Sequence, residues 1–237
     1  MAVMARFLRA LPLALLSPIL VSISWFALLL ADLASRFRPR KLGLDTLPAT
    51  SGVTVVIPNW NGRDLLEKYL PSVIEAATAV PESEVLVVDN GSQDGSADFV
   101  RKQFPQVGVL ALKGNLGFGG GSNEGFKAAK HDIVVLLNSD MRVDAGFLPP
   151  LLEGFSEPAV FAVSCQIFFS DPNKLRQETG LTEGWWENGA LRVRHRIDEV
   201  VTDLYPCFYG GGGSCAFDLR KFLELRSEEH TSELQSR

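Results

Sequence analysis

The strongest constraint on the fold is a pattern that occurs three times: a run of β-branched residues and leucine is followed at once by a short polar cluster. The runs are Val53–Ile57, Val85–Val88 and Ile133–Leu137, and the clusters are Pro58–Asn61, Asp89–Ser92 and Asn138–Asp140. Such unbroken runs are typical of strands buried on both faces, as in a parallel sheet that helices cover. The sequence therefore predicts an α/β fold with a mostly parallel sheet flanked by helices.

The polar clusters also predict where a ligand binds. In open sheets of this kind, ligands bind beyond the carboxyl ends of the strands. Asp89 and Asp140 both follow predicted strands, so we expect the two carboxylates to face one crevice. A carboxylate there can accept hydrogen bonds from the base or ribose of a nucleotide. The alternative is structural, because aspartates at strand ends often cap the next turn.

Five segments, in this order and spacing, resemble the family 2 glycosyltransferases, which have the GT-A type of fold. They are VVIPNWNG at 55–62, VLVVDNGSQDGS at 85–96, NLGFGGGSNEG at 115–125, LLNSD at 136–140 and GGGSCAFDLRKF at 211–222. The resemblance spans residues 53–225. It implies an inverting enzyme that uses a nucleoside-diphosphate sugar, with a glycan or lipid-linked acceptor, in the synthesis of a cell-surface glycan or polysaccharide.

The resemblance also implies roles for individual residues. The residues expected to bind the nucleotide-sugar are Pro58, Asn59, Trp60, Asp89, Asn115, Gly117, Asn123 and Ser139. A divalent cation, Mg²⁺ or Mn²⁺, is expected at Asp140, where the family carries an Asp-x-Asp motif. This chain has Asn138 in place of the first aspartate, so Asp140 is the one charged ligand, and phosphates and water complete its shell. Such a cation offsets the negative charge on a departing pyrophosphate.

The glycine-rich run at 115–123 differs from a dinucleotide-binding fingerprint. It lacks the G-x-G-x-x-G spacing and follows the third predicted strand rather than the first. Glycine here lets the backbone pass close to a nucleotide and begin a helix, while Asn115 and Asn123 supply polar contacts. A second glycine segment, Gly210–Gly213, permits a similar approach, and a plain flexible loop is the alternative.

Apolar spacing predicts the other elements. Helices are expected over 63–79, 96–104, 121–129 and 147–155, and strands over 107–112 and 160–169. The tryptophan pair Trp185-Trp186 and the alternating apolar and polar residues at Leu191–His195 together predict a hairpin.

Charge and cysteine content exclude some functions. The chain has a formal charge of −5, but residues 1–41 carry +5 and the remainder −10, which argues against a nucleic-acid-binding surface. Cys165, Cys207 and Cys215 form no CxxC pair and no zinc-ligand spacing. We interpret them as small core residues of a protein in a reducing compartment.

Residues Leu11–Ala31 contain no charged side chain and are long enough to cross a bilayer as a helix. We expect residues 1–41 to be a single-pass anchor with a basic flank, in preference to a cleaved signal peptide, and residues 42–52 to be a linker. More basic residues follow the apolar segment than precede it. This predicts an inner (plasma) membrane location with the domain in the cytoplasm.

The last twelve residues, 226–237, resemble the translation of a sequencing-library adapter, so we expect a non-native tail after an incomplete glycosyltransferase domain at 53–225. In the family, the general base lies downstream of the position of Leu225. We therefore assign no catalytic base and expect this chain to be an inactive, C-terminally truncated fragment. The alternatives are an enzyme resembling nucleotidyltransferases and a non-catalytic, membrane-anchored scaffold that binds nucleotide-sugars.

Overall fold

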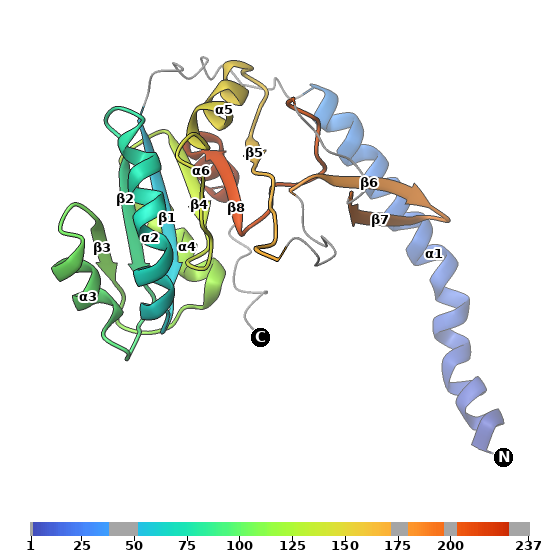
Figure 1. Cartoon of the computed structure of the whole chain (residues 1–237). Coiled ribbons are helices and arrows are strands. Elements are labelled where there is room, and N and C mark those ends of the chain that lie inside the picture. The colour runs from blue at the N-terminus through green and yellow to red at the C-terminus, as the bar shows by residue number, and fades with distance from the viewer. Residues whose placement is uncertain (1, 38–51, 172–179, 197–202, 228–237) are drawn as a thin grey trace. The chain divides into compact units, whose positions relative to one another are not determined.

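The computed structural model describes residues 2–37, 52–171, 180–196 and 203–227 (Figure 1). The chain divides into two compact units, residues 1–44 and 45–237. Most of the predicted linker at 42–52 lies outside the described residues, and so does the predicted tail beyond Ser227. Every residue for which a binding role is predicted belongs to the second unit.

The first unit holds one long helix, α1 (Ala2–Phe37), which contains the whole predicted span at 11–31. Large apolar side chains are exposed along its described part, from Leu15 to Leu33. Within the residues that the structure describes, no helix combines the length and the apolar character needed to cross a membrane. This finding does not support the span predicted for α1.

A six-stranded sheet forms the centre of the second unit, with the strand order β3-β2-β1-β4-β8-β5. Its strands are β1 (Val53–Asn59), β2 (Glu84–Asp89), β3 (Gly108–Ala111), β4 (Ile133–Leu137), β5 (Ala162–Ser164) and β8 (Ser214–Asp218). The first four strands run parallel to one another, whereas β8 is antiparallel to both β4 and β5. The predicted mostly parallel sheet is confirmed.

The second unit contains the helices α2 (Arg63–Thr78), α3 (Ser96–Gln103), α4 (Gly117–Ala128), α5 (Leu148–Glu153) with a 3₁₀ turn at Gly154–Ser156, and α6 (Leu219–Ser227). Four of them, α2 to α5, follow the strands in the order that the sequence predicts, whereas α6 was not predicted. Helix α4 begins four residues earlier than predicted, because Gly117 takes a φ of 73°, which turns the chain into the helix. Strand β5 is shorter than the apolar run at 160–169, and β8 was not predicted as a strand.

The sheet is packed on both faces, as the unbroken apolar runs predict. Alternate residues of each strand point to opposite faces, so Val55 and Ile57 belong to a different core cluster from Val56. Helix α2 packs on the first face, and α4 packs on the second through Phe126. Both helices flank the sheet in Figure 1.

Gly125 sets how closely α4 approaches the sheet. A Cβ atom at this position would lie 2.4 Å from Cγ1 of Val56 and 2.9 Å from Cγ2 of Val88, both of which are fully buried. Side chains in a packed interior cannot move far enough to admit that atom. The glycine therefore positions α4, and with it the glycine-rich segment from which the helix starts.

The predicted hairpin is present as β6 (Thr182–Glu187) and β7 (Ala190–His195), which pair antiparallel. Asn188 and Gly189 form its two-residue turn with φ angles of 51° and 76°. Two positive φ angles at an Asn-Gly pair are typical of the type I′ turn that favours hairpins.

Candidate functional site

Strand register brings the three polar clusters to one edge of the sheet. Asn59 pairs with Asp89 at the ends of β1 and β2, and Val56 pairs with Leu136 in β4. Because β1 and β4 are parallel, the residues that follow Leu137 emerge beside the end of β1. Asp89 and Asp140 therefore lie at the same carboxyl edge, with β1 between their strands.

Asp89 is a buried carboxylate without a partner. Its side chain is 6% exposed, and Oδ1 has no hydrogen-bond partner among the described residues. An aspartate that caps a turn accepts hydrogen bonds from the turn's backbone, and the structure shows no such bond for this carboxylate. Burying an unsatisfied acceptor is costly, so the geometry favours a side chain that receives its donor from a ligand.

The neighbouring residues of β1 differ in exposure. Pro58 and Asn59 are buried, and Oδ1 of Asn59 is a second buried acceptor without a partner among the described residues. Trp60 is 59% exposed, so its ring is not part of the core. An exposed indole next to buried acceptors is suited to stacking against a planar ring.

The turns after β1 and β2 are tied to each other. Ser92 Oγ accepts a hydrogen bond from the backbone N–H of Asn61 (2.9 Å), and Asn61 Oδ1 accepts one from the N–H of Gln93 (2.8 Å). Asp94 accepts from the N–H of Arg63 (2.9 Å) and from Ser96. Burial acts to raise the pKa of Asp94, but these hydrogen bonds outweigh it and lower the pKa. The two turns therefore form one fixed rim of the site.

A second wall comes from the glycine-rich segment before and within α4. Asn115 and Gly117 lie at its start, and both are exposed. Asn115 Oδ1 accepts hydrogen bonds from the N–H of Gly117 (2.7 Å) and from Nδ2 of Asn90 (3.1 Å), which joins this segment to the end of β2. Asn123 lies in the second turn of α4 and is half-buried.

The end of β4 meets the second glycine segment. The N–H of Asn138 donates to the carbonyl oxygen of Gly213 (2.9 Å), and a Cβ atom at Gly213 would lie 3.0 Å from Nδ2 of Asn138. A Cβ atom at Gly212 would lie 3.4 Å from the ring of Phe118 in α4. Residues distant in sequence thus converge here, and the segment 210–213 is a wall of the site.

The donor set at β4 is suited to a weakly held hard cation. Asp140 is exposed, and Asn138 and Ser139 are half-buried. In the described part of the chain, no three His, Cys, Asp or Glu side chains are arranged to hold a metal ion. One carboxylate with nearby amide and hydroxyl oxygens fits Mg²⁺ or Mn²⁺ that takes its remaining ligands from phosphate and water.

The described stretch 203–227 contains the acidic residues Asp203, Asp218 and Glu224, and we assign none of them as the catalytic base. The carboxylate of Asp218 is buried and paired with Arg220 (3.1 Å) and Lys221 (3.2 Å). A carboxylate held in this way is not available to accept a proton from an acceptor hydroxyl. Asp203 and Glu224 are exposed.

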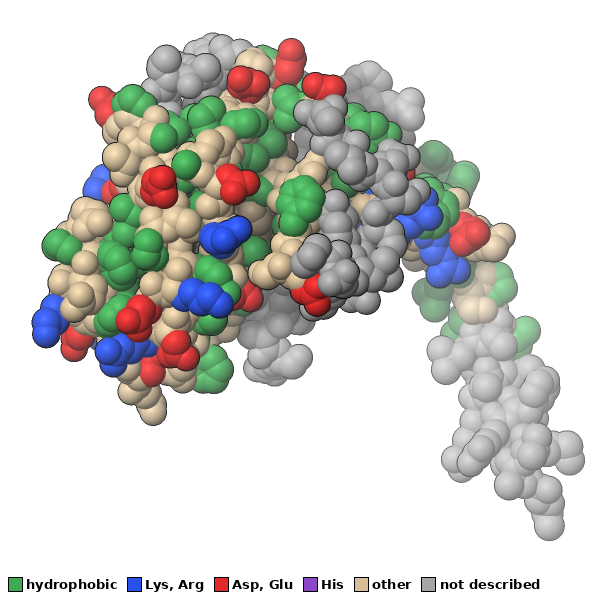
Figure 2. All heavy atoms as spheres, viewed as in Figure 1, with side chains coloured by type: hydrophobic (Ala, Val, Ile, Leu, Met, Phe, Trp, Pro, Cys, Tyr) green, Lys and Arg blue, Asp and Glu red, His purple; other side chains and the backbone are tan. Residues whose placement is uncertain are grey.

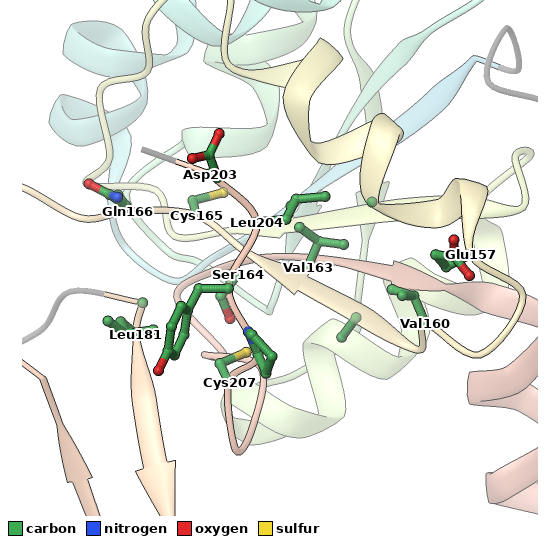
Figure 3. Close-up of a pocket in the computed structure, with 15 residues that line it drawn as sticks. Glu157, Val160, Val163, Ser164, Cys165, Gln166, Leu181, Asp203, Leu204 and Cys207 are labelled. Atoms are coloured by element: carbon green, nitrogen blue, oxygen red, sulfur yellow. The ribbon is translucent and has the colours of Figure 1, made fainter. Parts of the chain in front are cut away.

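A cavity of about 470 Å³ lies beside β5. Its lining includes Val163, Ser164, Cys165, Leu204 and Cys207, and in Figure 3 Leu204 lies close to Cys165 and Val163. Burial raises the pKa of the Cys165 thiol, so this thiol is a poor nucleophile. The lining contains none of the predicted site residues, but Ser164 Oγ accepts a hydrogen bond from the N–H of Gly211 (3.3 Å), in the wall formed by residues 210–213.

The face of the domain in Figure 2 carries basic and acidic side chains interspersed with apolar ones. It shows no continuous basic patch, in agreement with the excess of acidic residues in the second unit.

The sequence reasoning missed residues that hold the site together. Asn61, Ser92 and Asn90 link the turns and the glycine segment, yet none was predicted to have a role. Their signal in the sequence is indirect, since each lies in a cluster of Asn, Gly and Ser that follows a strand.

Comparison with known proteins identifies relatives. Residues 54–211 match the model of glycosyl transferase family 2. The undecaprenyl-phosphate 4-deoxy-4-formamido-L-arabinose transferase of Edwardsiella ictaluri is 35% identical over 67% of this chain and 46% of its own length. An uncharacterized glycosyltransferase of Mycobacterium bovis is 36% identical over 67% of this chain and 66% of its own length. The chain spans about half the length of the first of these relatives.

Two solved structures share the fold. The mannosyltransferase of Pyrobaculum calidifontis, in complex with GDP-Man and Mn²⁺, superposes with a TM-score of 0.52 at 23% identity, over 88% of this chain and 56% of its own. GalNAc-T7 with UDP, GalNAc and Mn²⁺ gives a TM-score of 0.55 at 18% identity, over 74% and 37% of the two chains. At these sequence identities, the structural similarity shows a shared fold only.

Proposed function

Since the chain belongs to glycosyl transferase family 2, we propose that it carries the donor-binding part of an enzyme that transfers a sugar from a nucleoside-diphosphate sugar. The observation that carries this proposal is Asp89, a buried carboxylate at the carboxyl edge of the sheet whose Oδ1 has no partner in the part of the chain that the structure describes. A nucleotide offers N–H and O–H donors that satisfy such a group. Pro58, Asn59 and Trp60 lie beside it and complete the nucleotide pocket.

The remaining predicted residues have distinct roles in this proposal. Asn115, Gly117 and Asn123 belong to the wall formed by α4 and the segment before it, and Ser139 lies next to the cation ligand Asp140. Mg²⁺ or Mn²⁺ at Asp140 supplies charge neutralisation of the pyrophosphate. The neighbours that were solved with Mn²⁺ support this choice of metal.

Nucleotide titration tests the donor site. UDP and GDP are titrated separately into the chain, and the affinity is compared for wild type, Asp89→Asn and the exposed control Asp98→Asn. We expect Asp89→Asn to lose most of the affinity and Asp98→Asn to retain it. Equal affinity in all three proteins would contradict a nucleotide contact at Asp89.

The cation has its own test. Mn²⁺ should tighten nucleotide binding in wild type and in the exposed control Asp144→Asn, but not in Asp140→Asn. If Asp140→Asn keeps the full effect of Mn²⁺, then Asp140 is a turn residue and holds no metal.

The proposed reaction is inverting transfer to a lipid-linked or glycan acceptor in cell-surface glycan or polysaccharide synthesis. The relative whose name specifies undecaprenyl phosphate supports a lipid-linked acceptor. Inversion requires a base that deprotonates the acceptor hydroxyl as it attacks, and we assign no residue of this chain to that role. The inactivity expected for the isolated chain stays a prediction, which a transfer assay with purified chain and labelled UDP- and GDP-sugars decides.

Family membership favours this reaction over nucleotidyl transfer. A non-catalytic scaffold that binds nucleotide-sugars is the second candidate, because the donor pocket is compatible with binding alone. Sugar transfer by the protein as its host cell makes it, lost in Asp140→Asn, would exclude the scaffold. Nucleotide binding without transfer would favour it.

We propose the inner membrane as the location, with the domain on the cytoplasmic side. The uncharged segment 11–31 and the exposed apolar side chains of α1 support this proposal, although the described residues contain no helix that qualifies as a span. Carbonate extraction of cell membranes tests it. Retention in the pellet is expected, and full release into the supernatant would overturn the proposal.

A further inference from the structure

We propose that Asn90 is a positioning residue that holds the glycine-rich wall of the donor site in place. The inference rests on the proposed function, because it concerns the shape of that site. Asn90 directly follows β2 and is 4% exposed, so its carboxamide is enclosed by protein.

The side-chain oxygen and nitrogen of Asn90 both form hydrogen bonds with the glycine-rich segment. Its Oδ1 accepts from the N–H of Leu116 (2.9 Å). Its Nδ2 donates to the carbonyl oxygen of Gly117 (2.9 Å) and to Oδ1 of Asn115 (3.1 Å). Three consecutive residues are thus held by one side chain, 25–27 positions earlier in the chain.

Backbone contacts hold Asn90 itself in place. Its N–H donates to the carbonyl oxygen of Asn59 (2.8 Å), which continues the β1–β2 ladder by one residue. Gly91 has a φ of 74°, and a Cβ atom there would lie 2.7 Å from the backbone of Gly114. A Cβ atom at Gly121 would lie 3.0 Å from Nδ2 of Asn90. Gly121 therefore leaves room for the Asn90 carboxamide, and Gly91 lets the turn after β2 pass close to the backbone of Gly114.

These contacts determine what the segment can do. The N–H groups of Leu116 and Gly117 lie at the start of α4, where a helix normally offers free donors to an anion. Here they are bonded to Asn90 and Asn115. The first two N–H groups of this helix start are consequently taken up by protein side chains, which fixes the start of α4 as a wall of the site.

The wall carries an exposed aromatic ring toward the opposite side of the site. Phe118 is 51% exposed, and its ring lies 3.4 Å from the position that a Cβ atom of Gly212 would take. By holding Leu116 and Gly117, Asn90 sets where Phe118 stands relative to the segment 210–213. The role of Asn90 is therefore to set the width of the site between its two glycine segments, without contact to substrate.

Hydrogen exchange and nucleotide affinity test this role together on the full chain. In Asn90→Ala, the Leu116 amide loses its acceptor and should exchange about tenfold faster, and the affinity for UDP or GDP should fall about tenfold. In Asn90→Asp, the acceptor for the Leu116 N–H remains. The second carboxylate oxygen, however, replaces the Nδ2 donor and repels the carbonyl oxygen of Gly117 and Oδ1 of Asn115. Leu116 should stay protected while the affinity falls as in Asn90→Ala.

Two controls separate positioning from general destabilisation. Thr54→Val removes a buried hydroxyl that bonds Glu84 and His131 at the opposite end of β1, so it weakens the fold without touching the site. It should leave the affinity unchanged. In an Asn115→Ala background, Asn90→Ala should cost less affinity than it does in wild type, because the two residues act through one bond.

The possible results distinguish a failure of the role of Asn90 from a failure of the proposed donor site. Unchanged exchange at Leu116 in Asn90→Ala, or equal affinity losses in Asn90→Ala and Thr54→Val, would overturn the positioning role. If the wild-type chain binds neither UDP nor GDP, then the proposed donor site fails, and the role of Asn90 in that site fails with it. Normal binding by wild type with normal binding by Asn90→Ala refutes the inference alone.

Discussion

Replacing Asp89 by asparagine should make the ligand-free chain more stable while it weakens nucleotide binding. The carboxylate is 6% exposed, and its Oδ1 is unsatisfied among the described residues. A buried polar group without a partner costs about 1–3 kcal/mol. The amide of asparagine has the same shape without the buried charge. We expect the free energy of unfolding to rise by about 1 kcal/mol.

Asp218 provides the matched comparison, because it is a buried carboxylate with partners. Asp218→Asn breaks its ion pairs with Arg220 and Lys221 and leaves the buried Lys221 with only the carbonyl oxygen of Val160 (2.5 Å). Breaking a buried pair costs about 3–5 kcal/mol. Because Arg220 is partly exposed, we expect a loss near the lower end, about 3 kcal/mol. Replacing aspartate by asparagine should thus raise the free energy of unfolding at position 89 and lower it at position 218.

Urea denaturation of the ligand-free chain measures both effects. With a slope of about 2 kcal/mol per molar urea, the midpoint should rise by about 0.5 M in Asp89→Asn and fall by about 1.5 M in Asp218→Asn. The affinity of Asp89→Asn for UDP or GDP should fall about 10- to 100-fold, the range for a hydrogen bond to a charged group. A loss of stability in Asp89→Asn with unchanged affinity would refute the reasoning and make Asp89 a turn residue.

Three further predictions follow from packing, charge and thiol burial. Gly125→Val should destabilise the domain by about 1–3 kcal/mol, measured by thermal denaturation, because its branched side chain overlaps Val56; an unchanged midpoint would contradict the close approach of α4. Burial acts to raise the pKa of Asp218, but its basic partners lower it below the ordinary value. The stability that Asp218 contributes should therefore be present above the unfolded-state pKa and lost as the pH falls through the folded-state pKa, and acid titration of Asp218→Asn should lack this loss. Burial raises the pKa of the Cys215 thiol to about 12, so disulfide reagents should label it only after denaturation, and rapid labelling of the native chain would contradict its burial.

The sheet could be predicted because its signal is local. The runs at 53–57 and 133–137 consist of β-branched residues and leucine, which form strands buried on both faces whatever their partners are. The polar residues after each run then had to emerge at one edge, since parallel strands end on the same side. Strand β8 has no such signal, because Ser214–Asp218 is short and follows glycines, and its pairing with β4 and β5 makes it a strand.

The predicted site residues were those whose chemistry is visible in their type. Asp89 was singled out because it follows a predicted strand of an open sheet, where ligands bind, and its lack of a partner among the described residues became apparent only from the fold. Asn90 next to it was overlooked, because its three contacts come from residues 25–27 positions away. Tertiary contacts of this kind leave no periodic pattern in a sequence. The exposure of Trp60 was also not predictable, because an indole at a strand end is equally suited to a core.

The bond between Asn138 and Gly213 has an evolutionary consequence. These residues leave and re-enter the sheet side by side, with 2.9 Å between the nitrogen of one and the oxygen of the other. The chain between them includes α5, the edge strand β5 and the hairpin β6–β7, and this bond joins the two ends of that excursion. An insertion, deletion or exchange within such an excursion changes the distance between its ends very little. Natural variation can therefore remodel this module from one relative to the next, while the edge that carries Asp89 and Asp140 keeps its geometry.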